Sequence, residues 1–276
     1  MDEIQLKKHA VNVRKNIVRM VYEASSGHIG GSLSATDLLT ALYFHVMDIN
    51  EDNVNTIERD RFVLSKGHVS PLLYSILEEK GLLHEDLATF RQINSKLQGH
   101  PNMNYVSGVD MSTGSLGQGI SCAVGMAMAE KYLKKNHRIY ALLGDGECEE
   151  GQVWEACMSA SQNKLNNLCA IVDINGLQID GSVAEIMDPD KIKDKFKAFG
   201  WNVICIHGHD FTEILDAFEQ AIQYQDGPSA IIAQTIKGKG VRFMENQVEW
   251  HGKAPSREQY EEAMQQLQEV YDAISN

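Results

Sequence analysis

The chain has 276 residues, 43% of them hydrophobic, which is enough for one large α/β domain with a packed core. The formal net charge of −13 argues against a nucleic-acid or anionic-membrane partner, because either would need a basic surface. No apolar run approaches the roughly 20 residues that span a bilayer, and the charged N-terminus lacks the apolar core of a signal peptide.

The first quarter of the chain predicts two helices joined by a loop. Apolar residues recur in steps of three and four between Ala10 and Ala24, which is typical of a helix. A glycine- and serine-rich segment, SSGHIGGSLS, follows as a predicted loop. We expect Ser34 to cap the next helix, with Asp37 three residues on as in a capping box, and residues 38–46 to form that helix.

The second quarter contains one strand, one helix and a long loop. The segment RFVLSKGH at 61–68 predicts a short strand that runs into a loop, and the apolar residues at 72–77 predict a helix that stops at Gly81. Residues 99–120 contain five glycines and little periodicity. A loop this long inside a compact domain is usually functional or disordered.

After residue 120, helices and strands alternate. Apolar strands are predicted at 138–147, 167–176, 201–208 and 229–238, and helices at 123–135, 154–165, 190–199 and 211–224. Because the strands are continuous apolar runs, both sheet faces should be covered. This predicts an α/β fold with a doubly wound, mostly parallel sheet and helices on both faces. Ser256 should cap a last helix, and residues 1–276 should form a single domain with the first and last helices packed on it.

Two polar side chains lie at the ends of neighbouring predicted strands. Asp145 stands between Gly144 and Gly146, and Asn175 follows 30 residues later. Mg²⁺ prefers such oxygen ligands and shares the rest of its sphere with phosphates, while the glycines let the backbone approach an anion closely. Each motif alone is most often a simple turn. Their joint position at the carboxyl edge of a parallel sheet indicates a Mg²⁺-diphosphate site.

Four histidines lie in glycine-containing loops. They are His28, His68, His100 and His251. A single loop histidine is most simply solvated or caps a helix, but four together indicate proton transfer or phosphate binding. The other six are interpreted as structural or surface residues: His9, His45, His84, His137, His207 and His209.

Two charged groups have a simpler explanation. Acidic residues crowd the helix start after GDG, and the helix dipole accounts for Glu147 and Glu149, whereas Glu150 and Glu155 need a partner. The KGKGV segment at 237–241 could touch a phosphate, but a solvated loop is the favoured interpretation.

The motifs together resemble a known family. GDG followed about thirty residues later by DINGLQIDG resembles the motif that binds thiamine diphosphate (ThDP). Further segments resemble the N-terminal ThDP domain of transketolase, in the order of that family and from about residue 10 to 255. They are SGHIGGSLS, DRFVLSKGHVSPLLYSIL, GHP, TGSLGQGISCAVGMAMAEK and GDGECEEGQVWEA.

The resemblance implies ThDP and Mg²⁺ as cofactors and a role for each matching position. The metal ligands would be the Asp145 and Asn175 side chains and the Leu177 carbonyl. The remaining cofactor-binding residues would be His68, Gly114, Leu116, Gly144, Gly146, Glu147, Ile179 and His251. The candidate catalytic residues are His28, His100 and His251, facing the sugar, and Glu150 and Glu155, linking two active sites across a subunit interface.

The sequence departs from the family in two ways. Ser115 replaces the usual proline of the GPLGQG motif, which removes rigidity but no ligand. The sequence also lacks the pyrimidine-binding domain with the glutamate that activates the cofactor, and it ends in a helix. The resemblance thus implies the N-terminal subunit of a split transketolase. A separate C-terminal subunit would complete a heterotetramer that moves a two-carbon ketol unit from a ketose or its phosphate to an aldose.

Three other functions are considered. A related ThDP enzyme, such as deoxyxylulose-phosphate synthase or a 2-oxo-acid dehydrogenase component, is less favoured because of the GHP and WHGKAP segments. A non-catalytic subunit with the same fold is disfavoured by the intact Asp145 and Asn175. A Rossmann protein would need GxGxxG after a strand, which is missing. Five scattered cysteines without a CxxC pair indicate reduced thiols and a cytoplasmic protein.

Overall fold

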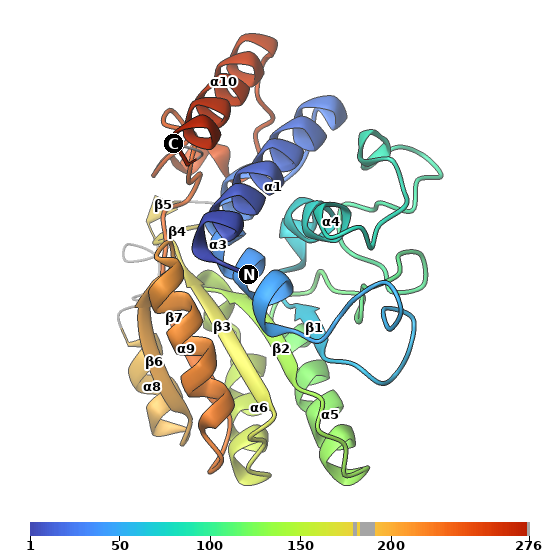
Figure 1. Ribbon diagram of the computed structural model, residues 1–276. Coiled ribbons are helices and arrows are strands. Elements are labelled where there is room, and N and C mark those ends of the chain that lie inside the picture. Colours follow the sequence, from blue (N-terminus) through green and yellow to red (C-terminus); the bar gives the residue numbers. More distant parts are fainter. Residues whose placement is uncertain (179–180, 183–190, 275–276) are drawn as a thin grey trace.

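A five-stranded parallel sheet lies at the centre of the fold (Figure 1). The computed structural model describes residues 1–178, 181–182 and 191–274. The strand order is β1-β2-β3-β7-β6, and every pair is parallel. The strands are β1 (Arg61–Leu64), β2 (Ile139–Gly144), β3 (Leu168–Ile174), β6 (Asn202–His207) and β7 (Ser229–Gln234). A separate antiparallel pair joins β4 (Leu177–Gln178) to β5 (Gly181–Ser182).

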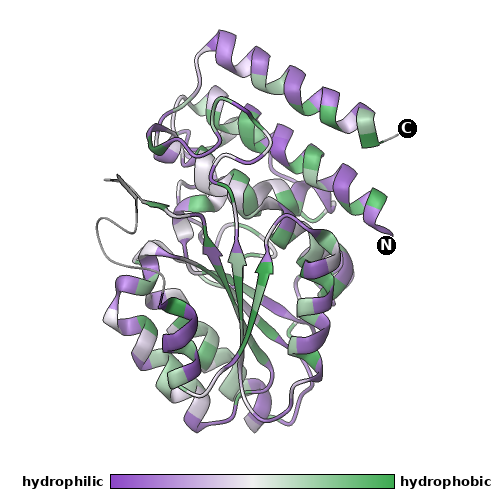
Figure 2. Cartoon of the chain, turned by 90° about the vertical axis from the view of Figure 1, so that its left-hand side faces the viewer, coloured by the Kyte–Doolittle hydropathy of each residue, from purple (hydrophilic) through white to green (hydrophobic). Residues whose placement is uncertain are grey.

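Helices cover both faces of this sheet, as the sequence predicts. Leu142 and Ile171 point into one apolar cluster, whereas their chain neighbours Leu143 and Ala170 point into the other. The first cluster contains residues of α1 (Glu3–Ala24), α3 (Thr36–Ala41), α4 (Ser70–Glu79) and α9 (Phe211–Gln223). The second contains residues of α5 (Gln118–Tyr132), α6 (Gly151–Gln162) and α8 (Ile192–Ala198). Apolar strands are therefore enclosed by helices whose outer surfaces are polar (Figure 2).

The first and last helices lie side by side at one end of the molecule. Figure 1 shows α1 next to α10 (Arg257–Ile274), and the Tyr22 and Tyr260 rings stack between them with centroids 4.3 Å apart. Ser256 caps α10 as predicted, because its hydroxyl accepts from the Gln259 backbone N–H. Within the described residues, none of these helices is both long and apolar enough to cross a membrane.

The predicted loop around His28 is wrong in part, because Ile29–Ser34 forms a short buried helix, α2. Glycines favour helices poorly, but here tertiary packing overrides propensity. A Cβ atom at Gly30 would lie 2.8 Å from the Trp250 carbonyl oxygen, so only glycine fits. Ser34 ends α2 instead of capping the next helix, and its hydroxyl donates to the Gly31 carbonyl.

Two further predictions need correction. The segment at 38–46 is helical, but it divides into α3 and a π-helix, Leu42–Val46. The expectation that every strand is covered on both faces is wrong at β6, where Cys205 and His207 are exposed. The reason is that β6 is an edge strand, paired only with β7 in this sheet.

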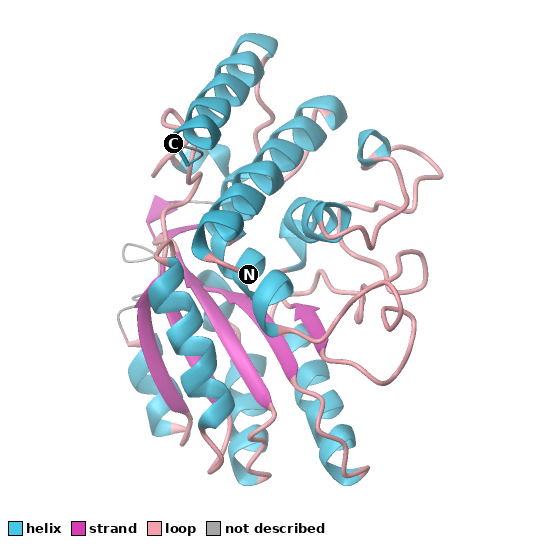
Figure 3. Ribbon diagram, viewed as in Figure 1, coloured by secondary structure: helices cyan, strands magenta, loops and turns pink. Residues whose placement is uncertain are grey.

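The long segment before α5 is largely irregular, as expected (Figure 3). Its only regular element among the described residues is a 3₁₀ turn, Leu87–Thr89, and α5 begins at Gln118, five residues before the predicted start. This segment and the turn Gly67–Val69 after β1 approach each other closely. A Cβ atom at Gly67 would lie 2.6 Å from the Thr113 hydroxyl oxygen.

Replacement of Gly119 by alanine should destabilise the chain, although alanine is the better helix former. A Cβ atom at Gly119 would lie 2.6 Å from the Ser65 Cα atom, so α5 would have to move away from β1. We expect a loss of about 1–3 kcal/mol in the free energy of unfolding. Gly125→Ala in the same helix is the matched control, because its Cβ would meet nothing within 4 Å. It should be stabilising by up to about 1 kcal/mol in urea unfolding, and equal effects would contradict the packing argument.

Candidate functional site

A cavity of about 260 Å³ opens at the carboxyl ends of β2 and β3. This is the edge at which parallel α/β sheets bind ligands. Asp145 follows β2 and Asn175 follows β3, and the strands lie in register with Gly144 beside Asp173. The lining residues are His28, Gly31, Lys66, His68, Gly114, Leu116, Gly144, Asp145, Gly146, Glu147, Asn175, Leu177, Lys237 and His251.

The three predicted metal ligands share this cavity. The Asp145 carboxylate accepts from the Gly146 N–H at 2.9 Å and from the Gly176 N–H at 2.8 Å, so backbone amides fix its orientation. The Asn175 side-chain oxygen accepts from the Leu177 N–H at 3.2 Å. Burial, and then the nearby Asp173, raise the pKa of Asp145. A bound cation would relieve the cost of the ionised carboxylate.

A buried ion pair, which the sequence interpretation missed, lies beneath these ligands. The Lys66 ammonium lies 2.7 Å from the Asp173 carboxylate, and both groups are almost inaccessible. Asp173 also accepts from the hydroxyls of Ser34 and Thr235. Burial alone would raise the pKa of Asp173, but Lys66 holds it below its ordinary value.

Three of the four predicted histidines form a cluster. The ring centroid of His28 lies 5.2 Å from those of both His68 and His251, and the centroids of His68 and His251 are 5.7 Å apart. Burial, then nearby cations, lower the pKa of His28 to about 4 and that of His251 to about 3. Burial also lowers the pKa of His68 well below its ordinary value. At neutral pH the cluster is uncharged and can accept protons or hydrogen bonds.

Lys237 is part of the cavity, so the interpretation of KGKGV as a solvated loop is wrong at this residue. Lys237 is 1% exposed. Its ammonium lies 3.2 Å from the Leu177 carbonyl oxygen and 3.0 Å from the His251 Nδ1 atom. The Gly238 N–H donates to the Gly30 carbonyl at 3.0 Å, which ties the loop to α2. Burial, then repulsion from Lys66, lower the pKa of Lys237 to about 8.

Glu147 shapes the cavity wall through hydrogen bonds to the protein. Its buried carboxylate accepts from the Ser65 hydroxyl at 2.5 Å, from the Gly117 N–H at 2.9 Å and from the Gly144 N–H at 3.1 Å. The helix-dipole explanation is therefore insufficient for Glu147. This one side chain connects three of the segments that surround the cavity.

The remaining predicted residues lie around the cavity or away from it. His100 does not line it but borders its wall, since a Cβ atom at Gly114 would lie 3.2 Å from the His100 ring. Burial, then Arg91, lower the pKa of His100. Glu150 and Glu155 are exposed and do not line the cavity. The prediction for Ile179 falls outside the described residues.

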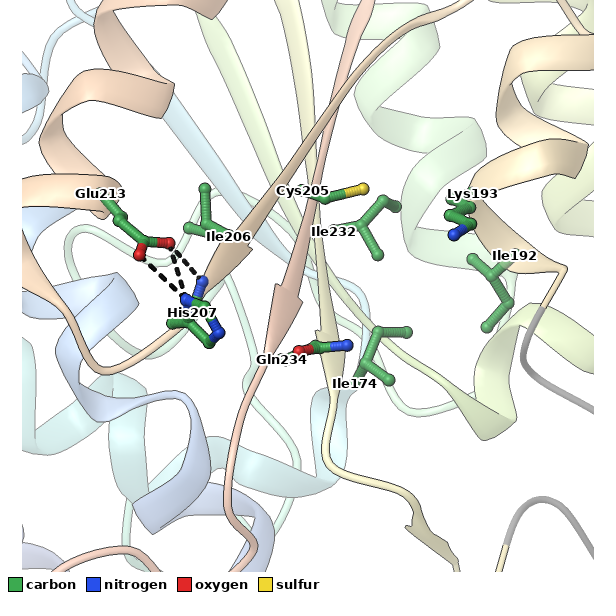
Figure 4. A pocket seen from close by; sticks show the side chains of 9 residues that line it. All are labelled: Ile174, Ile192, Lys193, Cys205, Ile206, His207, Glu213, Ile232 and Gln234. Carbon is green, nitrogen blue, oxygen red and sulfur yellow. Dashed lines mark hydrogen bonds and ion pairs between the residues drawn. The ribbon is translucent and has the colours of Figure 1, made fainter.

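A larger cavity of about 480 Å³ lies beside the edge strand β6 (Figure 4). It is lined by Ile174, Ile192, Lys193, Cys205, Ile206, His207, Glu213, Ile232 and Gln234. The His207 imidazole and the Glu213 carboxylate are bonded to each other at 2.9 Å. This cavity offers few convergent polar groups, so we place the functional site in the smaller cavity.

The residues of the smaller cavity fit a metal-bound diphosphate. Across the described part of the chain, no cluster of three or more His, Cys, Asp or Glu side chains could hold a metal. A metal at Asp145 would instead use the amide oxygen of Asn175 and the carbonyl of Leu177, and Mg²⁺ commonly completes such a set with phosphate oxygens. Lys66 and Lys237 supply positive charge beside these oxygens.

Comparison with known proteins decides the family. The sequence matches the family described as "Transketolase, thiamine diphosphate binding domain" over residues 6–271. The chain belongs to the transketolase family. The fold agrees with this, because the structure of transketolase from Campylobacter jejuni is 37% identical with a TM-score of 0.89.

Transketolase relatives differ in how much of their length this chain covers. It is 43% identical to an apulose-4-phosphate transketolase subunit of Phocaeicola vulgatus, covering 99% of this chain and 95% of that protein. It is also 43% identical to the 6-deoxy-6-sulfo-D-fructose transketolase subunit SqwG of Clostridium sp. (strain MSTE9), over 96% and 97% of the two chains. It is 41% identical to the Homo sapiens transketolase, but covers only 43% of it, and it covers 46% of the Campylobacter jejuni chain. The prediction of an N-terminal subunit of a split transketolase, a transferase, is confirmed.

Proposed function

We propose that this chain holds ThDP and Mg²⁺ and, with a C-terminal transketolase subunit, transfers a two-carbon ketol unit from a ketose to an aldose. The observation that carries the proposal is one cavity in which Asp145, Asn175 and Leu177 present oxygens beside Lys66 and Lys237. Oxygen ligands suit Mg²⁺, and the two ammonium groups suit a diphosphate.

The cavity residues would divide the cofactor between them. Asp145, Asn175 and the Leu177 carbonyl would bind Mg²⁺. The Gly146 N–H would donate to the diphosphate, because a backbone amide beside a glycine can approach an anion closely. Further contacts to the cofactor would come from Lys66, His68, Gly114, Leu116, Gly144, Glu147, Ile179, Lys237 and His251. ThDP, when bound, supplies the carbanion chemistry of ketol transfer.

The histidines would bind and orient the sugar. His28 Nδ1 is buried and has no hydrogen-bond partner among the described residues, so it is free to bond a substrate hydroxyl. With its pKa lowered to about 4, His28 is neutral at pH 7 and can accept a proton. We assign His251 and His100 the same type of role, with His100 beside the Gly114 wall.

The partner subunit would cover the open side of the cavity. Glu150 and Glu155 are exposed, which supports placing them at a subunit interface where they link two active sites. A heterotetramer of two of each chain is the proposed assembly. The two subunit relatives are named for sugars with a phosphate or a sulfo group. We therefore propose a ketose with an anionic group, as in sugar-phosphate metabolism, and a cytoplasmic location that suits five free cysteines.

Activity should require both subunits. The purified chain, saturated with ThDP and Mg²⁺, should show no measurable ketol transfer in a coupled assay with a panel of ketose phosphates. Addition of a C-terminal transketolase subunit from the same cell should restore turnover. Robust activity of the chain by itself would refute the shared site, and a complex that binds ThDP without transferring ketol groups would refute the reaction.

A further inference from the structure

Three buried polar side chains outside the cavity form a network next to the loop that carries Lys237. Arg14 donates to both Asp37 carboxylate oxygens, at 2.8 and 2.7 Å, and Asp37 also lies 2.7 Å from His209 Nδ1. Arg14 and Asp37 are buried, and none of the three residues lines the cavity. The network thus joins α1, α3 and the loop after β6 behind the site.

The network ends on the loop backbone on both sides of Lys237. On one side the Ile236 N–H donates to His209 Nε2 at 2.8 Å. On the other side the Arg14 Nε–H donates to the Lys239 carbonyl at 3.0 Å. Two hydrogen bonds from one network therefore fix the backbone one residue before and two residues after Lys237.

Each member of the network has a defined hydrogen-bonding role. Because His209 Nε2 accepts from Ile236, the proton of the neutral ring is on Nδ1 and is donated to Asp37. Burial alone would raise the pKa of Asp37, but Arg14 and the hydrogen bond from His209 hold it well below its usual range. Asp37 is therefore an ionised acceptor shared by a guanidinium and an imidazole.

We propose that His209, Asp37 and Arg14 are positioning residues that hold the Lys237 ammonium against the diphosphate of the cofactor. The inference rests on the function proposed above. A purely structural need could be met by apolar residues, since buried ion pairs are often no more stabilising than well-packed hydrophobic groups. Here the bonds bracket a 1% exposed lysine whose ammonium reaches into the cavity. Groups behind a binding site commonly orient those that touch the ligand.

Two substitutions at His209 separate positioning from structure. In His209→Asn the amide nitrogen can replace Nδ1 and keep the bond to Asp37, but the acceptor for Ile236 is lost. In His209→Gln the amide oxygen can replace Nε2 and keep that acceptor. Both variants remove the imidazole, so a loss of packing affects them equally. The probe is inorganic pyrophosphate with Mg²⁺, titrated calorimetrically into the full chain and into a Lys237→Met variant.

We expect His209→Asn to weaken pyrophosphate binding by about 10-fold or more, the usual effect of losing an orienting group. His209→Gln should stay within about threefold of the unsubstituted chain. His209→Asn combined with Lys237→Met should bind no more weakly than Lys237→Met, because both remove the same contact. Equal losses in the two His209 variants, or additive losses with Lys237→Met, would overturn the inference. Failure of the unsubstituted chain to bind pyrophosphate would overturn the proposed function as well.

Discussion

Asp145→Asn should abolish Mg²⁺-dependent binding of ThDP and lower ketol transfer by the two-subunit enzyme about 10³-fold or more. Asp145 is the only carboxylate among the three proposed metal ligands, so the variant leaves Mg²⁺ with neutral oxygens from the protein. Metal ions contribute several kcal/mol in such sites, and each 1.36 kcal/mol is tenfold in rate. Calorimetry with ThDP and Mg²⁺ and steady-state turnover measure the two effects.

The stability of the chain without cofactor is the control for this variant. Burial and the nearby Asp173 raise the pKa of Asp145 in the folded chain, so its ionisation costs stability at neutral pH. Asparagine carries no charge and has nearly the same shape. The free energy of unfolding should therefore be unchanged or higher in Asp145→Asn. A variant that keeps Mg²⁺-dependent affinity for ThDP would contradict the assignment of Asp145 as a ligand.

Asp173→Ala should lower the free energy of unfolding at pH 7 by about 3–5 kcal/mol, the usual cost of leaving one charge of a buried pair without its partner. The Lys66 ammonium would then be buried without a counter-charge, and the hydroxyls of Ser34 and Thr235 would lose their acceptor. Urea unfolding of the chain without cofactor measures the loss. A change below about 1 kcal/mol would show that Asp173 is not the counter-charge of Lys66.

The pH dependence and a double variant test the same pair. The pKa of Asp173 is lowered from 3.8, so its contribution is complete above that value and is lost as the pH falls through the folded pKa. The difference between Asp173→Ala and the unsubstituted chain should therefore shrink below about pH 4, the ordinary carboxyl range. Adding Lys66→Met should recover part of the stability, because it removes the unpaired charge.

Hydrophobic patterning predicts the second half of the fold well. Strands such as Ile139–Gly144 and Leu168–Ile174 are apolar on both faces, and the structure encloses them between helices. The pattern fails where glycines make a close approach possible. Ile29–Ser34 has the composition of a loop, yet it is helical because Gly30 packs against the Trp250 carbonyl.

Prediction of the site is best for residues that directly follow a strand. Asp145 and Asn175 lie where the sheet topology places ligands, and the structure brings them together with Leu177 and three of the four loop histidines. Lys66 and Lys237 could not be found in this way. A lysine is expected in solvent unless its buried counter-charge is known, and Asp173 lies 107 residues from Lys66 in the sequence.

Glu147 has a consequence for the order in which the chain folds. Its carboxylate bonds Ser65, 82 residues away, and Gly117, 30 residues away, as well as Gly144 close by. Contacts between distant parts of a chain form late, because a large loop must close before they stabilise anything. The three segments can reach their final positions only after β1 and β2 have paired and α5 has docked. The diphosphate site is therefore assembled in the last steps of folding, and a nascent chain has no cofactor site until these elements are in place.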